Sequence, residues 1–284
     1  MIRLCAFSDE AAKSIEGQIA AMRRNNIRLT ELRSVDGVNV KKMTVEAAKE
    51  YHKALTDNGI KVWAIGSPLG KVDVNINMSE YLETVKHICN LANIFETDKI
   101  RMFSFFNAYG SRNEVIENLG LMIECGKAFG VNMYHENEKD IYGDTAERVL
   151  DLLDNVADLR CVYDPANFLQ CGESAALTLK KIHSRTDYFH VKDVISETEQ
   201  IVPAGYGDGR INEIISRITD DKVMTLEPHL KVFSGYGDVD ATEMKNKFCF
   251  DSNDQAFDAA VAAIKALLTR EGYTENFENG EFVK

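Results

Sequence analysis

Short apolar runs rich in β-branched and aromatic residues recur along the chain, and longer segments with a helical spacing of apolar residues separate them. The short runs predict strands, because these residue types favour a pleated, half-buried surface. They occupy residues 4–7, 29–32, 62–65, 100–103, 132–134, 160–163, 188–191 and 223–226. Between them, apolar side chains such as Ile15, Ile19 and Met22 fall on one helical face. Strands that alternate with helices are typical of a parallel sheet.

The number of these units indicates the architecture. Eight β/α units, with no linker rich in Pro, Gly or Ser, favour an α/β fold of the closed (β/α)8 TIM-barrel type, which usually needs about 250 residues. We therefore predict one domain over residues 1–284. A doubly wound sheet would carry G-x-G-x-x-G after its first strand, and the chain has no such motif there. The polar tail, residues 271–284, either packs loosely or ends an edge.

Local signals mark some of the helix ends. Ser111 with Glu114, and Asp144 with Glu147, have the spacing of a capping box at a helix N-terminus. Gly130 follows a helical segment and suits a left-handed C-terminal cap. These positions predict helix boundaries that agree with the apolar periodicity.

The acidic balance of the chain limits the partners that we expect. It has 33 Lys and Arg residues against 45 Asp and Glu residues, a net charge of -12, which repels nucleic acid and anionic membrane surfaces. No run approaches the roughly 18 apolar residues of a membrane span, and the N-terminus lacks a signal-peptide pattern. The scattered cysteines, without a C-x-x-C pair, fit reduced thiols. We expect a cytoplasmic protein with a small-molecule substrate and no nucleic-acid or membrane partner.

Acidic and imidazole side chains gather where the last four predicted strands end. Active sites of TIM barrels lie at the C-terminal ends of the strands. One such position follows or closes each of these strands: Glu136, Asp164, His190 and Glu227. Each residue alone is compatible with a helix cap or a hydrogen-bonded core side chain. Together, four adjacent strands bring them to one half of the barrel mouth.

Carboxylates this close repel one another and raise each other's pKa, a conflict that a divalent cation resolves. Three carboxylates and one imidazole favour Mn²⁺ or Mg²⁺, with Co²⁺ or Zn²⁺ as alternatives. Such an ion can bind two neighbouring oxygens of a sugar, polarise the carbonyl and stabilise an enediolate. The sequence therefore predicts one divalent metal ion and a sugar substrate.

Four motifs carry a resemblance to a known family: H-E-N-E at 135–138, Y-D-P-A-N-F at 163–168, H-V-K-D at 190–193 and L-E-P-H at 226–229. In order and spacing the chain resembles the xylose-isomerase-like barrel superfamily, which includes ketose 3-epimerases, hydroxypyruvate isomerase, inosose dehydratase and an apurinic-site endonuclease. The resemblance implies that Glu136, Asp164, His190 and Glu227 bind the metal. It also implies that Glu136 and Glu227 transfer protons in a sugar or sugar-phosphate isomerase or epimerase of carbohydrate metabolism.

Two positions depart from the ketose 3-epimerases of that superfamily. Those enzymes place a histidine three residues after the strand-six aspartate and an arginine six residues after the strand-seven histidine. This chain has Asn167 and Ser196 there. We expect Asn167 to hydrogen-bond a substrate hydroxyl, but the known 3-epimerase specificity is not implied.

Further candidates lie near the same strand ends. Lys192 either holds an anionic or hydroxyl group of the substrate or forms a solvated ion pair with Asp193. Glu31 and Arg33 close the second strand, where they either meet each other or contact substrate, and we name Arg33 as a substrate-binding candidate.

Other conspicuous side chains have a mainly structural interpretation. Strand alternation points His135 away from the barrel interior, to pack among helices, and His229 either lines the mouth or is a loop histidine. Trp63 and Phe103 favour core packing over a cover for a sugar. The G-x-G-x-G stretch at 205–209 forms either a phosphate or hydroxyl contact or a tight loop.

Two other functions stay open. A metal-dependent dehydratase of a keto sugar or an inosose would use the same enediolate to expel a hydroxyl group. A non-catalytic sugar-binding barrel would keep the fold without turnover, although two glutamate bases argue against it. A nuclease would need more histidines and a basic groove, which six histidines and a net charge of -12 disfavour. Barrels of this kind commonly pair through their strand-end loops, so a homo-oligomer is compatible with the sequence.

Overall fold

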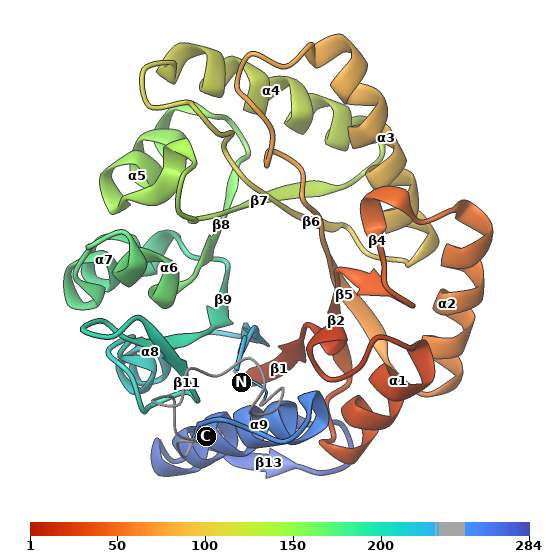
Figure 1. Ribbon diagram of the computed structural model, residues 1–284, viewed down its shortest axis with the longest axis vertical. Coiled ribbons are helices and arrows are strands. Elements are labelled where there is room, and N and C mark those ends of the chain that lie inside the picture. The colour runs from red at the N-terminus through yellow and green to blue at the C-terminus, as the bar shows by residue number, and fades with distance from the viewer. Residues whose placement is uncertain (231, 233–247) are drawn as a thin grey trace, which may run out of the picture.

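Eight parallel strands surround the centre of the molecule, and helices form a ring outside them (Figure 1). The computed structural model describes residues 1–230, 232 and 248–284. The barrel strands are β1 (Ile2–Ala6), β2 (Leu29–Leu32), β5 (Lys61–Gly66), β6 (Lys99–Met102), β7 (Asn132–Glu136), β8 (Arg160–Tyr163), β9 (Tyr188–Val191) and β12 (Lys222–Leu226). β12 pairs in parallel with β1, from Ile2 opposite Lys222 to Ala6 opposite Leu226, and this pairing closes the barrel. The predicted (β/α)8 TIM barrel is confirmed.

The helices between the strands each bury one face against the barrel. They are α1 (Ile15–Arg24), α2 (Val45–Asp57), α3 (Met78–Ile94), α4 (Arg112–Ala128), α5 (Ala146–Asn155), α6 (Pro165–Gln170), α7 (Ala175–Ile182), α8 (Ile211–Arg217) and α9 (Asn253–Arg270). In α1 the predicted stripe of Ile15, Ile19 and Met22 is buried. Within the described chain, no helix combines the length and apolarity that a membrane span needs.

The predicted helix ends are partly confirmed. Gly130 adopts a φ of 73° just after α4, as a left-handed cap requires. Ser111 is the N-cap residue of α4, but its side chain makes no capping hydrogen bond. The Asp144 prediction is wrong, because Thr145 caps α5 and accepts a hydrogen bond from the backbone N–H of Arg148. Asp144 instead ends a 3-10 turn, η3 (Tyr142–Asp144), and its carboxylate pairs with Arg148.

Short elements complete the chain. β3 (Ser34–Val35) pairs with β4 (Val38–Asn39), and β10 (Asp193–Ile195) pairs with β11 (Gln200–Val202). Three further 3-10 turns are η1 (Ser8–Glu10), η2 (Val40–Lys42) and η4 (His183–Arg185). The polar tail forms a hairpin of β13 (Thr274–Asn276) and β14 (Glu281–Val283), and β14 pairs antiparallel with the first residues of β1. The tail therefore ends an edge, and its Phe282 is buried.

Two adjacent layers of the barrel interior determine the surroundings of the strand ends. Alternate residues of a strand share one face, so positions two apart stack along the barrel axis. The lower layer is an apolar cluster, called here the floor, in which Leu29 and Trp63 pack against five buried side chains: Cys5, Tyr134, Val162, Tyr188 and Val223. Two residues further along their strands, Tyr134 and Tyr188 are followed by the ionisable Glu136 and His190. The floor therefore supports a charged layer at the C-terminal ends of the strands.

Candidate metal centre at the barrel mouth

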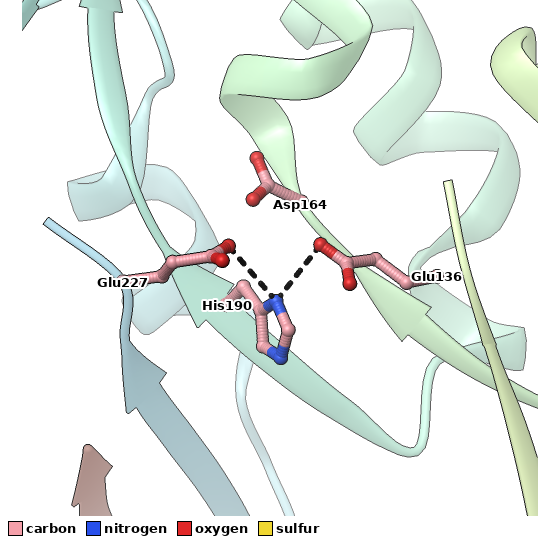
Figure 2. Close-up of side chains that lie close together, drawn as sticks. All are labelled: Glu136, Asp164, His190 and Glu227. Atoms are coloured by element: carbon pink, nitrogen blue, oxygen red, sulfur yellow. Dashed lines mark hydrogen bonds and ion pairs between the residues drawn. The ribbon is translucent and has the colours of Figure 1, made fainter. Parts of the chain in front are cut away.

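The four predicted ligands meet at the C-terminal ends of four neighbouring strands (Figure 2). Glu136 is the last residue of β7 and His190 lies within β9, while Asp164 and Glu227 directly follow β8 and β12. Asp164 also caps α6, accepting a hydrogen bond of 2.9 Å from the backbone N–H of Asn167. All four side chains are buried, and one ligand atom from each lies within 4.8 Å of the others.

The imidazole of His190 is held at both nitrogens. Its Nδ1 faces the cluster, 3.0 Å from Glu136 Oε1 and 3.4 Å from Glu227 Oε2. Its Nε2 lies 3.1 Å from Glu31 Oε2, on the side away from the cluster. A metal-binding histidine usually donates its second N–H to a carboxylate, which fixes the ring and its tautomer. Glu31 is placed to do this, whereas the sequence predicted it to contact substrate or Arg33.

Two buried cations share the carboxylates of the cluster. The ammonium of Lys192, 6% exposed, lies 2.9 Å from Asp164 Oδ2 and 3.2 Å from Glu227 Oε2. Arg101 Nε lies 3.2 Å from Glu136 Oε2. Even so, Glu136 Oε2 and Asp164 Oδ2 are buried without a hydrogen bond of normal geometry to any described residue. The cluster therefore keeps acceptor capacity that its protein partners do not use.

The two glutamates are stabilised as carboxylates. Burial alone would raise their pKa values, because it disfavours the charged form. His190 and Arg101 outweigh burial at Glu136 and lower its pKa to about 2. Lys192, together with hydrogen bonds from His190 and His229, lowers the pKa of Glu227 well below its usual value.

Asp164 and His190 have raised pKa values, in contrast to the two glutamates. Burial raises the pKa of Asp164 to about 6; Lys192 opposes this effect, and the neighbouring Glu227 and Glu136 add to it. Burial alone would lower the pKa of His190, but Glu136 and Glu31 raise it well above its usual value. Without an ion, the excess of negative charge in the cluster shifts both groups toward their protonated forms.

A divalent cation fits this donor set. Three carboxylates and one imidazole offer ligand atoms within 4.8 Å of one another, two of the carboxylate oxygens accept no hydrogen bond of normal geometry, and Glu31 contacts the outer nitrogen of the histidine. Oxygen-rich sets of this kind suit hard or borderline divalent ions. These observations support a metal site and do not select the ion.

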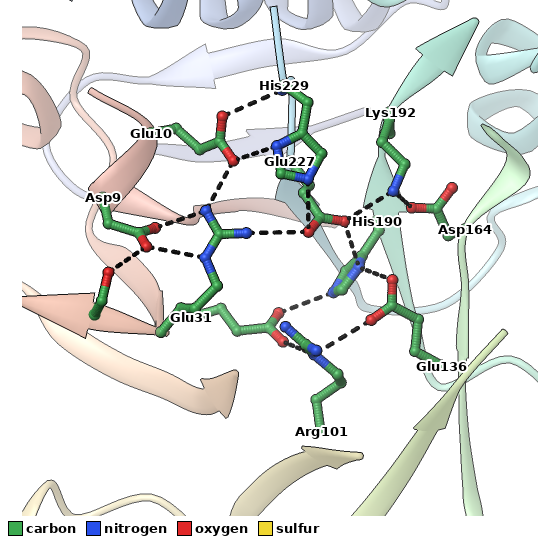
Figure 3. Close-up of polar contacts among 12 residues, drawn as sticks. Asp9, Glu10, Glu31, Arg101, Glu136, Asp164, His190, Lys192, Glu227 and His229 are labelled. Atoms are coloured by element: carbon green, nitrogen blue, oxygen red, sulfur yellow. Dashed lines mark hydrogen bonds and ion pairs between the residues drawn. The ribbon is translucent and has the colours of Figure 1, made fainter. Parts of the chain in front are cut away.

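A second set of charges lies beside Glu227 (Figure 3). Arg33 contacts Asp9 at 2.9 Å, Glu10 at 2.8 Å and Glu227 Oε1 at 3.3 Å. His229 bridges Glu10, at 2.8 Å from Nδ1, and Glu227 Oε1, at 3.3 Å from Nε2. His229 therefore lines the mouth, and the two carboxylates raise its pKa to about 9 against the opposing effect of burial. Arg33 is held by three acids at the mouth, 24% exposed, where a ligand can reach it.

Asn167 is buried beside the cluster, where its side chain has protein partners. Its amide group donates to Glu136 Oε1 at 3.3 Å and to the backbone carbonyl of Asn137 at 2.9 Å. Asn137 in turn bonds the backbone of Asp164 through both side-chain atoms, at 2.9 Å each. Asn167 therefore orients Glu136, and its contact with a substrate hydroxyl stays a prediction.

The glycine-rich loop has an internal partner. The backbone N–H groups of Gly205, Gly207 and Gly209 donate to the carboxylate of Asp193, at 2.8, 3.1 and 2.8 Å. Val194 adds a fourth N–H at 3.0 Å. The predicted tight loop thus encloses a carboxylate of its own chain. Asp193 is bound in this loop, and Lys192 contacts Asp164 and Glu227 instead of forming a solvated pair with it.

The remaining predicted residues lie outside the cluster. His135 is buried, with Nε2 2.9 Å from Ser104 Oγ, and faces away from the acids as predicted. Trp63 belongs to the floor, and Phe103 is buried under the guanidinium of Arg101 at 4.6 Å. Arg101 was missed by the sequence interpretation. Its signal was a cation inside the otherwise apolar predicted run of residues 100–103, which requires a buried acid as partner.

Comparisons with known proteins agree with this fold. A family model described as Xylose isomerase-like TIM barrel matches residues 19–245. The comparison with curated protein sequences gave no match. Among solved structures, the chain is similar to the probable 3-DHS dehydratase AsbF involved in petrobactin synthesis from Bacillus anthracis, with a TM-score of 0.70 and 18% identity over 94% of this chain and 98% of that chain.

Two further structures share the fold. One is an L-ribulose 3-epimerase, with a TM-score of 0.67 and 16% identity over 95% of each chain. The other is the IOLI protein with a binding zinc atom, with a TM-score of 0.72 and 12% identity over 95% of this chain and 99% of that chain. Since the family model covers most of the sequence and the barrel is closed as in these structures, the chain belongs to the Xylose isomerase-like TIM barrel family.

Proposed function

We propose that this chain is a divalent-metal-dependent isomerase or epimerase of a keto sugar or sugar phosphate. In this proposal Glu136, Asp164, His190 and Glu227 hold the ion, and Glu136 and Glu227 also transfer protons. The observation that carries it is the buried cluster in which all four side chains offer a ligand atom within 4.8 Å of the others. A cluster this acidic is costly for the fold unless it binds something.

The two glutamates support proton transfer. Both have lowered pKa values and are therefore carboxylates at neutral pH, as a general base must be. They enter the cluster from opposite sides of His190 (Figure 2). One, as a carboxylate, can remove the proton next to the substrate carbonyl, leaving an enediolate. The other, once it has taken a proton from solvent or substrate, can return that proton to the opposite face, and the two groups end the cycle with their protonation states exchanged. A proton returned to the neighbouring carbon instead would give aldose-ketose isomerisation.

The other residues at the mouth would bind and orient the substrate. A bound divalent ion supplies Lewis-acid polarisation of the carbonyl. Burial would lower the pKa of Lys192, but Asp164 and Glu227 raise it, so Lys192 stays an ammonium that can donate to a substrate oxygen. Arg33 offers a partly exposed guanidinium at the rim, and Asn167 fixes Glu136. We expect Mn²⁺ or Mg²⁺ to be the working ion, with Co²⁺ or Zn²⁺ as alternatives.

A dehydratase is the second candidate. The buried ammonium of Lys192 lies between Asp164 and Glu227, where it can stabilise a departing hydroxyl group. One similar structure is that of a probable 3-DHS dehydratase, at 18% identity. In this reaction Glu136 or Glu227 would remove the proton, and the enediolate would expel the hydroxyl on the next carbon.

Product analysis tests the proposal. Purified protein is first analysed for bound divalent metal, then incubated with ketoses, ketose phosphates and inososes in the presence of Mn²⁺. We expect one equivalent of metal and formation of an isomer or epimer of the same mass. A product lighter by one water would replace the isomerase with the dehydratase. Sugar binding without turnover, in a protein that carries the metal, would identify a non-catalytic binding barrel.

A further inference from the structure

A cavity of about 380 Å³ lies at the end of the barrel opposite to the metal cluster. Its volume falls in the range of about 300–1,000 Å³ that is usual for small-molecule sites. The cavity forms because two strands, β14 and β2, pair with different parts of the same edge of β1. β14 pairs with β1 at Ile2 and Arg3, while β2 pairs with β1 only from Cys5 onward. The two neighbours of β1 diverge below this point, and the turn before β14 closes the gap.

Three cations from three neighbouring strands line this cavity. Arg3 lies near the start of β1, Arg28 directly precedes β2, and Lys61 is the first residue of β5. None of the three makes an ion pair with a described residue, and the Nε atoms of Arg3 and Arg28 are buried without a hydrogen-bond partner. Arg160, at the same end of the barrel, instead pairs with Asp187 at 3.1 Å.

The acids in the same cavity leave these cations unpaired. Glu281 lies opposite Arg3 in the β1–β14 pair, yet its Oε2 accepts a hydrogen bond of 2.7 Å from Asn279. Glu278 is the second acid in the lining, so three cations face two carboxylates. Buried guanidinium donors without acceptors are costly, and the excess positive charge favours an anionic acceptor.

We propose that this cavity binds a small oxyanion, a phosphate or a carboxylate, through Arg3, Arg28 and Lys61. Guanidinium groups match the oxygens of such anions in a forked geometry. The ligand is not the substrate of the metal centre, because the floor lies between the two ends of the barrel interior. Binding ties the C-terminal hairpin to β1 and β2, so the anion stabilises the folded chain.

The hairpin turn is already fitted to this end of the barrel. Gly280 has a φ of 74°, and a Cβ at this position would lie 2.5 Å from the backbone oxygen of Asn26. The side chain of Asn26 donates to Glu275 at 3.1 Å and to the carbonyl of Phe277 at 3.2 Å. The wall that the turn contributes is therefore fixed in place, and the cavity is a built site.

Calorimetric titration with inorganic phosphate and with citrate, each at ionic strength matched with sodium chloride, tests the proposal. We expect saturable binding and a rise in unfolding temperature that sodium chloride does not give. Arg28→Gln and Lys61→Gln should each weaken binding about tenfold or more, because each removes a charged donor. Arg185→Gln, at an exposed arginine paired with Asp154, is the matched control and should bind as wild type.

The outcomes separate this site from the metal centre. Lys61 is exposed, so Lys61→Gln keeps the test valid if an arginine variant does not fold. Each variant should retain wild-type affinity for Mn²⁺, and loss of anion binding alone supports the proposal. Phosphate affinity unchanged in both Arg28→Gln and Lys61→Gln would overturn it, as would heats and unfolding temperatures equal to those in sodium chloride. Citrate or phosphate binding tighter than the other identifies the preferred oxyanion.

Discussion

The mouth and the floor of this barrel are built from the same strands and have opposite character. Along each strand a step of two residues, roughly 7 Å, moves from one layer to the other. At the floor, Tyr134 and Tyr188 pack edge to face at 5.6 Å, and Tyr188 packs likewise on Trp63 at 6.3 Å. At the mouth the same strands present Glu136 and His190, buried among further charges. The buried charged groups of the mouth, which are costly to desolvate, thus lie directly on the apolar floor, whose burial stabilises the fold.

One residue joins the two layers. The ring of Tyr188 belongs to the floor, while its hydroxyl donates to Glu31 Oε1 at 3.1 Å. Glu31 then contacts His190 through its other oxygen. The orientation of the candidate ligand therefore depends on packing below it, although the charges that define the cluster come from the strand ends. Variants in each layer should separate chemistry from stability.

The largest effect is expected from the two glutamates at the mouth. Glu136→Gln and Glu227→Gln each remove a base and should lower kcat by about 10³-fold or more, since general bases contribute roughly 10²–10⁴-fold. Steady-state kinetics with the substrate identified from the panel measures this. Unfolding in urea should also show a loss of stability in each variant, because the lowered pKa values mean that the fold favours the charged form of both groups and their buried cationic partners stay behind. Retained turnover in either variant would exclude that residue as a proton-transfer group.

A floor variant should lose stability without losing affinity for the metal. Trp63→Ala empties part of the lower layer and should cost about 3 kcal/mol of unfolding free energy, as removal of a large core aromatic does. Its affinity for Mn²⁺ should stay within about twofold of wild type if the layers are independent. Trp63→Phe, which keeps an aromatic ring against Tyr188, is the milder control. A parallel loss of metal affinity in Trp63→Ala would show that the floor also sets the geometry of the mouth.

Glu31→Gln tests the link between the layers. The amide keeps the shape of the side chain but removes the carboxylate that faces His190 Nε2, so metal affinity should fall about 10–100-fold. Competition with a fluorescent chelator measures this without any assay of activity. Glu138→Gln is the matched control, because Glu138 lies at the mouth but pairs with Lys71 at 2.8 Å. Equal affinities in the two variants would remove Glu31 from the support of the histidine.

The fold and the four clustered residues could be predicted because both depend on local periodicity. Each strand is recognisable in the sequence by its apolar run, and its last residues lie at the mouth of a barrel. The alternation of inner and outer positions also separates His135 from Glu136, and it would have placed Lys192 on the face of His190. The inner position of Lys192 on its strand was therefore a better guide to its partners than the neighbouring acid Asp193.

Contacts across the barrel could not be predicted in the same way. Arg101 meets Glu31 at 3.6 Å and Glu136 at 3.2 Å, and these pairings depend on how far each strand is shifted against the others. Thr145 caps α5 in place of the predicted Asp144, whose carboxylate instead contacts Arg148 and accepts a hydrogen bond from the hydroxyl of Tyr109. Such choices among partners follow from tertiary distances, which a single sequence does not contain.

The smallest effect is expected in the loop that holds Asp193 behind the mouth. A Cβ on Gly207 would lie 2.4 Å from Asp193 Oδ1 and 2.6 Å from the backbone oxygen of Val194. Gly207→Ala should therefore push the carboxylate out of its ring of N–H donors and cost about 1–2 kcal/mol of unfolding free energy. Gly110→Ala, where a Cβ meets nothing within 4 Å, should cost less than about 0.5 kcal/mol in the same urea titration. Because Asp193 follows Lys192, a displaced Asp193 should also disturb substrate binding, so Gly207→Ala should raise KM more than it lowers kcat. Equal stability of the two alanine variants would show that the loop tolerates the displaced carboxylate.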